Sequence, residues 1–147
     1  MDILSIGILL FVLIESANIV ILYKRPGEKL GNGVGVFKSY EKSKEDKEMY
    51  EFVKYMVNWV AGVKLIFVLL LIVIALKGSE DLKVWVILAL IVSIMTFYVK
   101  LYPIIKGMDK NGELVDKGYS KKLFWMITII LIVFVKVLIL YFLDTNL

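Results

Sequence analysis

The chain has 147 residues, 60% of them hydrophobic, a net charge of +4 and a mean hydropathy of +0.82. A soluble domain is about 45 to 50% apolar, so this composition predicts an integral membrane protein. The chain contains no cysteine and no histidine. Disulfide bonds, thiol chemistry and thiolate or imidazole ligation of a metal or haem are therefore excluded.

Four apolar segments follow one another along the chain, at about residues 3–23, 52–76, 84–102 and 123–143. Each is close to the ~20 residues with which a helix crosses the roughly 30 Å of bilayer hydrocarbon. We therefore predict an all-α membrane protein, with residues 1–147 forming a single domain that is a bundle of four transmembrane helices.

The basic residues of the connecting segments predict the orientation. Seven lie within residues 24–51 and six within residues 100–122, whereas the turn between the second and third segments carries only Lys77 and Lys83. Because short loops rich in lysine and arginine stay in the cytoplasm, we expect the loops at about 24–51 and 103–122 to be cytoplasmic. Both termini would then lie outside, in a multi-pass protein of the cell membrane.

Local signals predict how the two long loops are built. Ser43, with Asp46 three residues later, forms a capping box from which the second helix would begin and run unbroken into the membrane. Pro103 is expected to end or kink the third helix at Tyr102. The sequence DKNG at residues 109–112 predicts a turn that could carry a small hairpin, and Ser120 is placed to cap the fourth helix.

Two ligand-binding hypotheses for these loops fail on spacing. The glycine-rich stretch from Pro26 to Gly35 lacks a preceding strand and a following GK[ST], so it predicts irregular backbone rather than a phosphate cradle. An EF-hand starting at Asp109 needs glycine at position six, whereas Gly112 stands at position four. We predict neither a metal site nor a cofactor.

Ionisable side chains inside the apolar segments are the most informative feature, because a charge at membrane depth normally has a partner or a function. Helix rise places Glu15 and Lys64 near the middle of their segments, within reach of an ion pair, and Lys136 about 4 Å to the outer side of its midpoint. Helical phase gives each segment one face with small or polar residues, and we expect these faces to converge. The predicted intramembrane polar cluster comprises Glu15, Asn18, Asn58, Lys64, Ser93, Thr96, Thr128 and Lys136.

Three functions are compatible with this cluster. The first is a non-enzymatic membrane component in which Glu15 and Lys64 form a buried structural pair. The second is a proton-coupled transporter of a small solute that uses Glu15. The third is a binder of an anionic solute or lipid headgroup through Lys64 and Lys136. We predict no enzyme, since the sequence has no nucleophile elbow or phosphate loop; at most Asp109, Glu113 and Asp116 would serve a headgroup reaction.

The sequence LIESANIV around Glu15 resembles the small multidrug resistance transporters, which are also short four-helix chains with a single membrane-embedded glutamate in the first helix. The resemblance implies a dimer as the working unit if the function is transport. This chain departs from that family in its long charged first loop and in Lys64 and Lys136.

The expected partners are the lipid bilayer and a second copy or a larger membrane assembly, and no nucleic acid, since topology already explains the basic loops. Lysine outnumbers arginine seventeen to one. This bias predicts a prokaryotic source that is either thermophilic or AT-rich, and both remain open.

Overall fold

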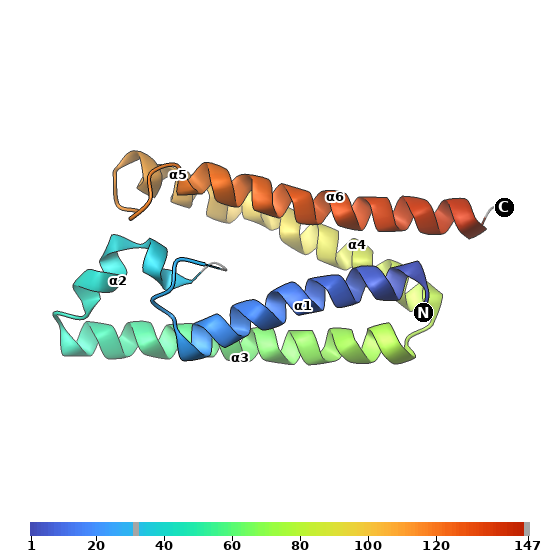
Figure 1. Cartoon of the computed structure of the whole chain (residues 1–147), viewed down its shortest axis with the longest axis horizontal. Helices are drawn as coiled ribbons and strands as arrows, with labels where there is room; N and C mark the ends of the chain where they lie inside the picture. Colours follow the sequence, from blue (N-terminus) through green and yellow to red (C-terminus); the bar gives the residue numbers. More distant parts are fainter. Residues whose placement is uncertain (31–32, 146–147) are drawn as a thin grey trace.

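The computed structural model describes residues 1–30 and 33–145 and is built from helices throughout that part of the chain (Figure 1). Two short helical elements, η1 and α2, interrupt the first loop. The third long helix is continuous but consists of α4, a π-helical segment η2, and α5. The elements in chain order are α1 (Ile3–Lys24), η1 (Val34–Val36), α2 (Lys38–Ser43), α3 (Lys47–Lys77), α4 (Glu80–Thr96), η2 (Phe97–Leu101), α5 (Tyr102–Lys110) and α6 (Tyr119–Thr145).

Four helical stretches are long and apolar enough to cross a membrane: Ile3–Lys24, Lys47–Lys77, Glu80–Lys110 and Tyr119–Thr145. They run roughly along one axis, so the bundle has two ends (Figure 1). We call the end with Met1, the turn at 78–79 and the C-terminal end of α6 the terminal end. The opposite end, which carries residues 25–30, 33–46 and 111–118, is the loop end.

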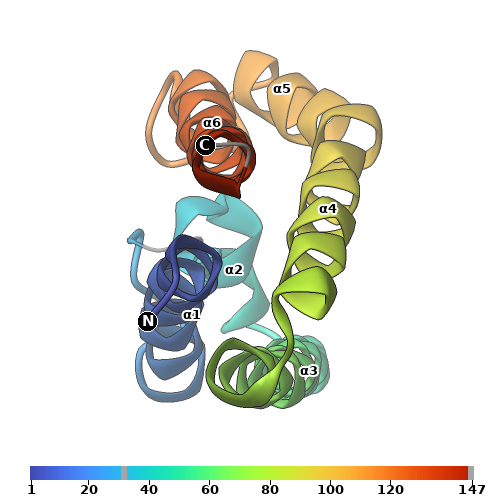
Figure 2. The ribbon, with the colours of Figure 1, turned by 90° about the vertical axis from the view of Figure 1, so that its right-hand side faces the viewer.

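All four long helices pack against one another only toward the terminal end. There one apolar cluster, which we call the terminal cluster, joins α1, α3, α4 and α6; its most buried members are Leu4, Ile8, Ile87 and Phe134. Viewed along the bundle, α1 lies beside α3, and α4 slopes from α3 toward α5 (Figure 2). Because of this slope, the pair α1–α3 and the pair α4–α6 separate toward the loop end.

Two smaller apolar clusters replace the terminal cluster at the loop end. The α1–α3 cluster consists of Leu22, Val57 and Ala61, with Val34 of η1 packed against it. The α5–α6 cluster is centred on Val36 of η1 and also contains Phe97, Ile105, Leu114, Tyr119 and Leu123. The element η1 therefore contacts both halves of the bundle, through Val34 and Val36. The short helix α2 lies between α3 and α5 (Figure 1).

The predicted start of the second membrane helix at Ser43 is wrong. The carboxylate of Asp46 accepts hydrogen bonds from the amides of Glu48 and Met49, at 3.0 and 3.2 Å, and so caps α3. Ser43 instead ends α2, is buried, and donates to the Tyr40 carbonyl at 2.7 Å. The extended backbone of Asp46, with φ −119° and ψ 113°, separates the two helices.

Pro103 does not end the third long helix, which begins at Glu80 and runs on to Lys110. Proline has no N–H, and its ring crowds the carbonyl four residues earlier, here that of Val99. The backbone widens into the π-helical η2 just before this proline, where the amide of Tyr102 donates to the carbonyl of Phe97 five residues back. The expected disturbance is therefore a π-segment inside a continuing helix.

The DKNG turn ends α5 but forms no hairpin of its own. Gly112 has φ +71°, and the amide of Glu113 donates to the Met108 carbonyl at 2.9 Å, which is the pattern of a Schellman cap. The chain then pairs with the first loop: Leu114 forms an antiparallel bridge with Phe37. The hairpin prediction failed because the partner of this extended segment lies more than seventy residues away.

The start of α6 is fixed by Asp109 of α5 rather than by Ser120. The Asp109 carboxylate accepts hydrogen bonds from the amides of Gly118 and Ser120, both at 2.9 Å, and from the Ser120 hydroxyl at 2.6 Å. Ser120 is therefore a donor to the capping carboxylate and not the cap that we predicted. A carboxylate near the first amides of a helix also interacts favourably with the helix dipole.

The glycine-rich stretch of the first loop has irregular backbone, as predicted, over residues 26–30 and at Gly33, whereas Val34 and Gly35 belong to the 3₁₀ turn η1. A side chain at Gly35 would collide with the carbonyl of Gly27, so two backbone segments approach each other more closely than any other residue allows. Gly31, which belongs to the same stretch, lies outside the described residues.

Candidate functional site

Glu15 and Lys64 meet between α1 and α3, as their depth in the sequence predicted. The Lys64 Nζ lies 2.6 Å from the Glu15 Oε2, and the two side chains are 28% and 18% exposed. Carboxylate and ammonium neutralise each other one to one. Breaking this partly buried pair is costly, because removing either partner leaves the other as an uncompensated charge.

Asn18 completes the site. It lies three residues after Glu15 on α1, and its Oδ1 accepts a second hydrogen bond from the Lys64 Nζ at 2.7 Å. Its Nδ2 is buried and has no hydrogen-bond partner among the described residues. A buried donor without an acceptor costs about 1 to 3 kcal/mol, so this amide is an unsatisfied polar group directly beside the ion pair.

The site lies where the packing of the bundle changes. On α3, Lys64 follows Ala61 of the α1–α3 cluster by one turn and precedes Val68 of the terminal cluster by another. Apolar residues therefore lie above and below the polar groups on the same helix face. The pair stands at the level where the two halves of the bundle begin to separate.

The remaining predicted members of the cluster do not converge on this site. Asn58 is exposed and donates to the Lys54 carbonyl of its own helix at 2.8 Å. Thr96 is also exposed and donates to the Ser93 carbonyl at 2.6 Å. Ser, Thr and Asn side chains can satisfy themselves on a carbonyl one turn earlier, so their presence in a span does not force them inward.

Thr128 and Lys136 occupy two further places on α6. The Thr128 Oγ1 lies 2.7 Å from the Tyr98 hydroxyl, which connects α6 to η2. Lys136 is on the outer surface of α6 and has no ion pair or hydrogen bond with its side chain in the part of the chain that the structure describes. Of the eight predicted residues, the structure brings together Glu15, Asn18 and Lys64.

A second ion pair, which we did not predict, closes the terminal end. Lys83 of α4 is only 6% exposed, and its Nζ lies 2.8 Å from the Oδ2 of Asp2. Asp2 also caps α1 through the Ser5 amide at 2.8 Å, and the Ser5 hydroxyl donates to the Ala75 carbonyl of α3 at 2.8 Å. The sequence signal was an aspartate just before an apolar run, which is the usual position of a helix cap.

The electrostatics of Asp2 follow from these contacts. Burial by itself would raise the pKa of the carboxyl group, but the hydrogen bonds from Lys83 and from the Ser5 amide outweigh it. The pKa of Asp2 therefore lies well below its usual range, and the group is ionised at neutral pH.

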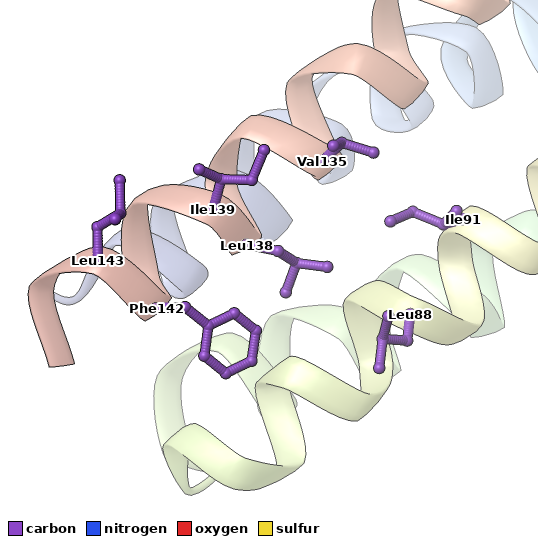
Figure 3. A pocket seen from close by; sticks show the side chains of 7 residues that line it. All are labelled: Leu88, Ile91, Val135, Leu138, Ile139, Phe142 and Leu143. Carbon is purple, nitrogen blue, oxygen red and sulfur yellow. The ribbon is translucent and has the colours of Figure 1, made fainter. Parts of the chain in front are cut away.

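An apolar groove of about 450 Å³ runs between α4 and α6 (Figure 3). Leu138 of α6 points toward α4 across it. Its lining is entirely aliphatic and aromatic, so it offers shape and apolar contact but no hydrogen bond. The lining residues are Leu88, Ile91, Val135, Leu138, Ile139, Phe142 and Leu143.

Four helices that are long and apolar enough to cross a membrane, packed around an apolar cluster, are compatible with the class of multi-pass helical membrane proteins. The chain matches no family model, and no curated protein or solved structure matches it. Functional inference therefore depends on the site itself.

Proposed function

We propose that this chain is a non-enzymatic, multi-pass component of the cell membrane in which the Glu15–Lys64 pair fixes α1 against α3. The observation that carries the proposal is the geometry of Lys64, whose one ammonium group contacts both Glu15 and Asn18 of α1, at 2.6 and 2.7 Å. Both contacts depend on one relative position of the two helices, so the pair specifies their register.

The proposed topology has residues 25–46 and 111–118 in the cytoplasm and both termini outside. It is supported by the distribution of lysine and arginine. Thirteen basic residues, seven plus six, lie around these loops, whereas two lie at the turn between α3 and α4. The working state includes the bilayer and a second copy or a larger assembly. The exposed Lys136 supports an assembly, because a charge on a span surface is costly in contact with lipid chains.

One observation favours a second candidate, a proton-coupled transporter of a small solute working as a dimer. The buried Nδ2 of Asn18 lacks an acceptor among the described residues, directly beside the only carboxylate within the central part of the spans. A water molecule or solute group bound there would also contact Glu15. The anion-binding hypothesis has less support, because Lys64 is already neutralised by Glu15 and Lys136 lies on the outer surface of α6.

The first experiment is a double-mutant cycle of thermal stability in one detergent, with Glu15→Gln, Lys64→Met and the double variant. For a structural pair we expect Lys64→Met to cost about 3 kcal/mol, because it leaves the Glu15 carboxylate alone, and the double variant to recover much of that loss. Lys136→Met is the matched control, since it removes a lysine at similar depth that has no ion pair with any described residue.

If Glu15→Gln leaves stability unchanged or raises it, the structural role is refuted and transport becomes the leading hypothesis. The next measurement is then flux into reconstituted vesicles. Loss of flux in Glu15→Gln, with the fold retained, would establish the second candidate.

A further inference from the structure

A second polar pocket lies at the loop end, separate from the Glu15–Lys64 pair. Its volume is about 240 Å³, and it is formed by the last turn of α1, by Tyr40 of α2, and by the first turns of α3. Lys54, which lines it, precedes Lys64 by ten residues, or about 15 Å of helix rise. A pocket of this volume is far larger than the space that one water molecule needs, so it has room for a small polar group.

The charged groups that line this pocket are all cationic. Lys24 and Lys54 contribute two ammonium groups, and no carboxylate is among the lining residues. Neither ammonium forms an ion pair or hydrogen bond within the described part of the chain. Glu48 and Glu51 also belong to the first turns of α3 but do not line the pocket. The lining residues themselves therefore carry a net positive charge.

Two phenol groups add hydrogen-bond donors. Tyr40, which is 7% exposed, and the half-buried Tyr50 lie with their ring centroids 6.3 Å apart and both line the pocket. Burial raises the pKa of the Tyr40 hydroxyl, and its side-chain hydrogen bond with Tyr50 raises this pKa further. Because one hydroxyl of the pair donates to the other, the pair keeps one O–H that can donate to an anion. Lysine and tyrosine donors together suit the oxygens of a phosphate group.

The floor of the pocket is apolar and belongs to the membrane-spanning part of the bundle. Leu22 and Val57 line it and are also members of the buried α1–α3 cluster. A ligand here would have its charge beside the loops and its body beside apolar side chains. With α1 and α3 in a bilayer, this level is that of the headgroups.

We propose that this pocket binds the phosphate group of an anionic phospholipid of the cytoplasmic leaflet, through Lys24, Lys54 and the remaining O–H of the Tyr40–Tyr50 pair. The lipid is favoured over a soluble phosphate because the pocket opens at the end of two spans and has an apolar floor. Basic residues next to a span attract anionic lipids, and a pocket with oriented donors adds selectivity to this attraction. The inference uses the proposed topology but does not depend on the role of the Glu15–Lys64 pair.

The test compares the full chain in nanodiscs of phosphatidylcholine alone and of phosphatidylcholine with phosphatidylglycerol. Anionic lipid should raise Tm by about 3 °C, because a ligand that binds only the folded state stabilises it. The variants Lys24→Gln and Lys54→Gln should each weaken retention of phosphatidylglycerol, measured by native mass spectrometry, about tenfold. Lys54→Arg should retain most of the effect.

Lys100→Gln is the matched control, since this exposed lysine lies near the loop end on the other half of the bundle and lines neither of the pockets described above. If Lys100→Gln reduced the Tm shift as much as Lys54→Gln does, general surface charge would explain it and the pocket assignment would be overturned. Inorganic phosphate is added separately to nanodiscs of phosphatidylcholine alone. Stabilisation by phosphate without stabilisation by phosphatidylglycerol would overturn the lipid assignment.

Discussion

The two ends of this bundle are held together in different ways. At the terminal end, all four long helices share one apolar cluster, and the Asp2–Lys83 pair connects α1 to α4. At the loop end, the helices form two pairs with separate clusters, and η1 contacts both through Val34 and Val36. Packing therefore joins the halves directly at one end and through a loop at the other.

This difference has a consequence for where the molecule can change shape. Separating α1–α3 from α4–α6 at the terminal end would expose Leu4, Ile8, Ile87 and Phe134, which are almost fully buried. At the loop end, the same separation needs only the withdrawal of η1 and the breaking of a few loop hydrogen bonds, among them that from the Val115 amide to the Val36 carbonyl at 2.9 Å. Local opening is expected where few buried contacts hold it.

The largest expected effect comes from the terminal cluster. Phe134 is 1% exposed and its ring lies 5.4 Å from that of Phe11, so Phe134→Ala should leave a cavity and cost about 3 kcal/mol of unfolding free energy. Ile132→Ala, on the exposed side of α6, should change stability by less than about 0.5 kcal/mol. Reversible unfolding in mixed micelles measures both.

Val36→Ala sharpens this comparison, because Val36 is as buried as Phe134 but belongs to the loop end. Hydrogen exchange should quicken in all four long helices for Phe134→Ala, but mainly in residues 33–40 and 111–120 for Val36→Ala. Uniform quickening in both variants would show that the two ends unfold as one unit.

The second effect tests the ion pair of the terminal end. Lys83→Met leaves the Asp2 carboxylate without its cation and should cost about 2 kcal/mol. Lys77→Met, which removes an exposed lysine at the same end, should cost less than about 0.5 kcal/mol. Equal Tm values for Lys83→Met and the wild type would mean that apolar packing alone closes this end.

The same pair predicts a pH dependence. The pKa of Asp2 is lower in the folded state than its usual value of about 3.9, so the unfolded chain takes up a proton first as pH falls. The contribution of Asp2 is therefore present at neutral pH and lost below about pH 4. Tm of the wild type should fall more steeply there than Tm of Asp2→Asn, which keeps a capping side chain but cannot ionise.

How much of this architecture was predictable depends on the range of the interactions. Long apolar runs predicted the four helices. The depth of each residue along its span, together with helical phase, predicted the Glu15–Lys64 contact, because each of these signals can be recognised within one helix at a time. The capping of α6 by Asp109 was missed because that carboxylate reaches across a loop whose path depends on the positive φ of Gly118, +84°. Distant pairing of Phe37 with Leu114 leaves no local pattern at all.

The expected convergence of polar faces failed for a different physical reason. Only Lys64 and Glu15 carry charges that need each other, whereas the hydroxyl of Thr96 and the amide of Asn58 are satisfied by their own helices. Helical phase shows which residues share a face but does not decide whether that face is inside. A charged side chain does decide which face is inside when a partner of opposite sign lies at the same depth.

A smaller effect concerns the glycines of the loop end, where backbone conformation can be separated from space. A side chain at Gly107 or at Gly112 would meet no atom within 4 Å, but only Gly112 has a positive φ. Gly112→Ala should therefore cost about 1 kcal/mol, whereas Gly107→Ala, inside α5, should stabilise the protein by up to about 1 kcal/mol. Changes in Tm of opposite sign for the two variants would establish the left-handed cap of α5, and a rise in Tm for both variants would contradict it.

The smallest effect comes from the exposed ion pair between the two loops. The Lys29 Nζ lies 3.2 Å from the Asp116 Oδ1, but both side chains are more than half exposed, so water and salt screen their attraction. Lys29→Met should change Tm by less than about 1 °C. If it instead destabilised the protein as much as Val36→Ala, surface charge and not the burial of η1 would hold the loop end together. The expected contrast places that role on the apolar contacts of η1, which connect the pair α1–α3 to the α5–α6 cluster at the loop end.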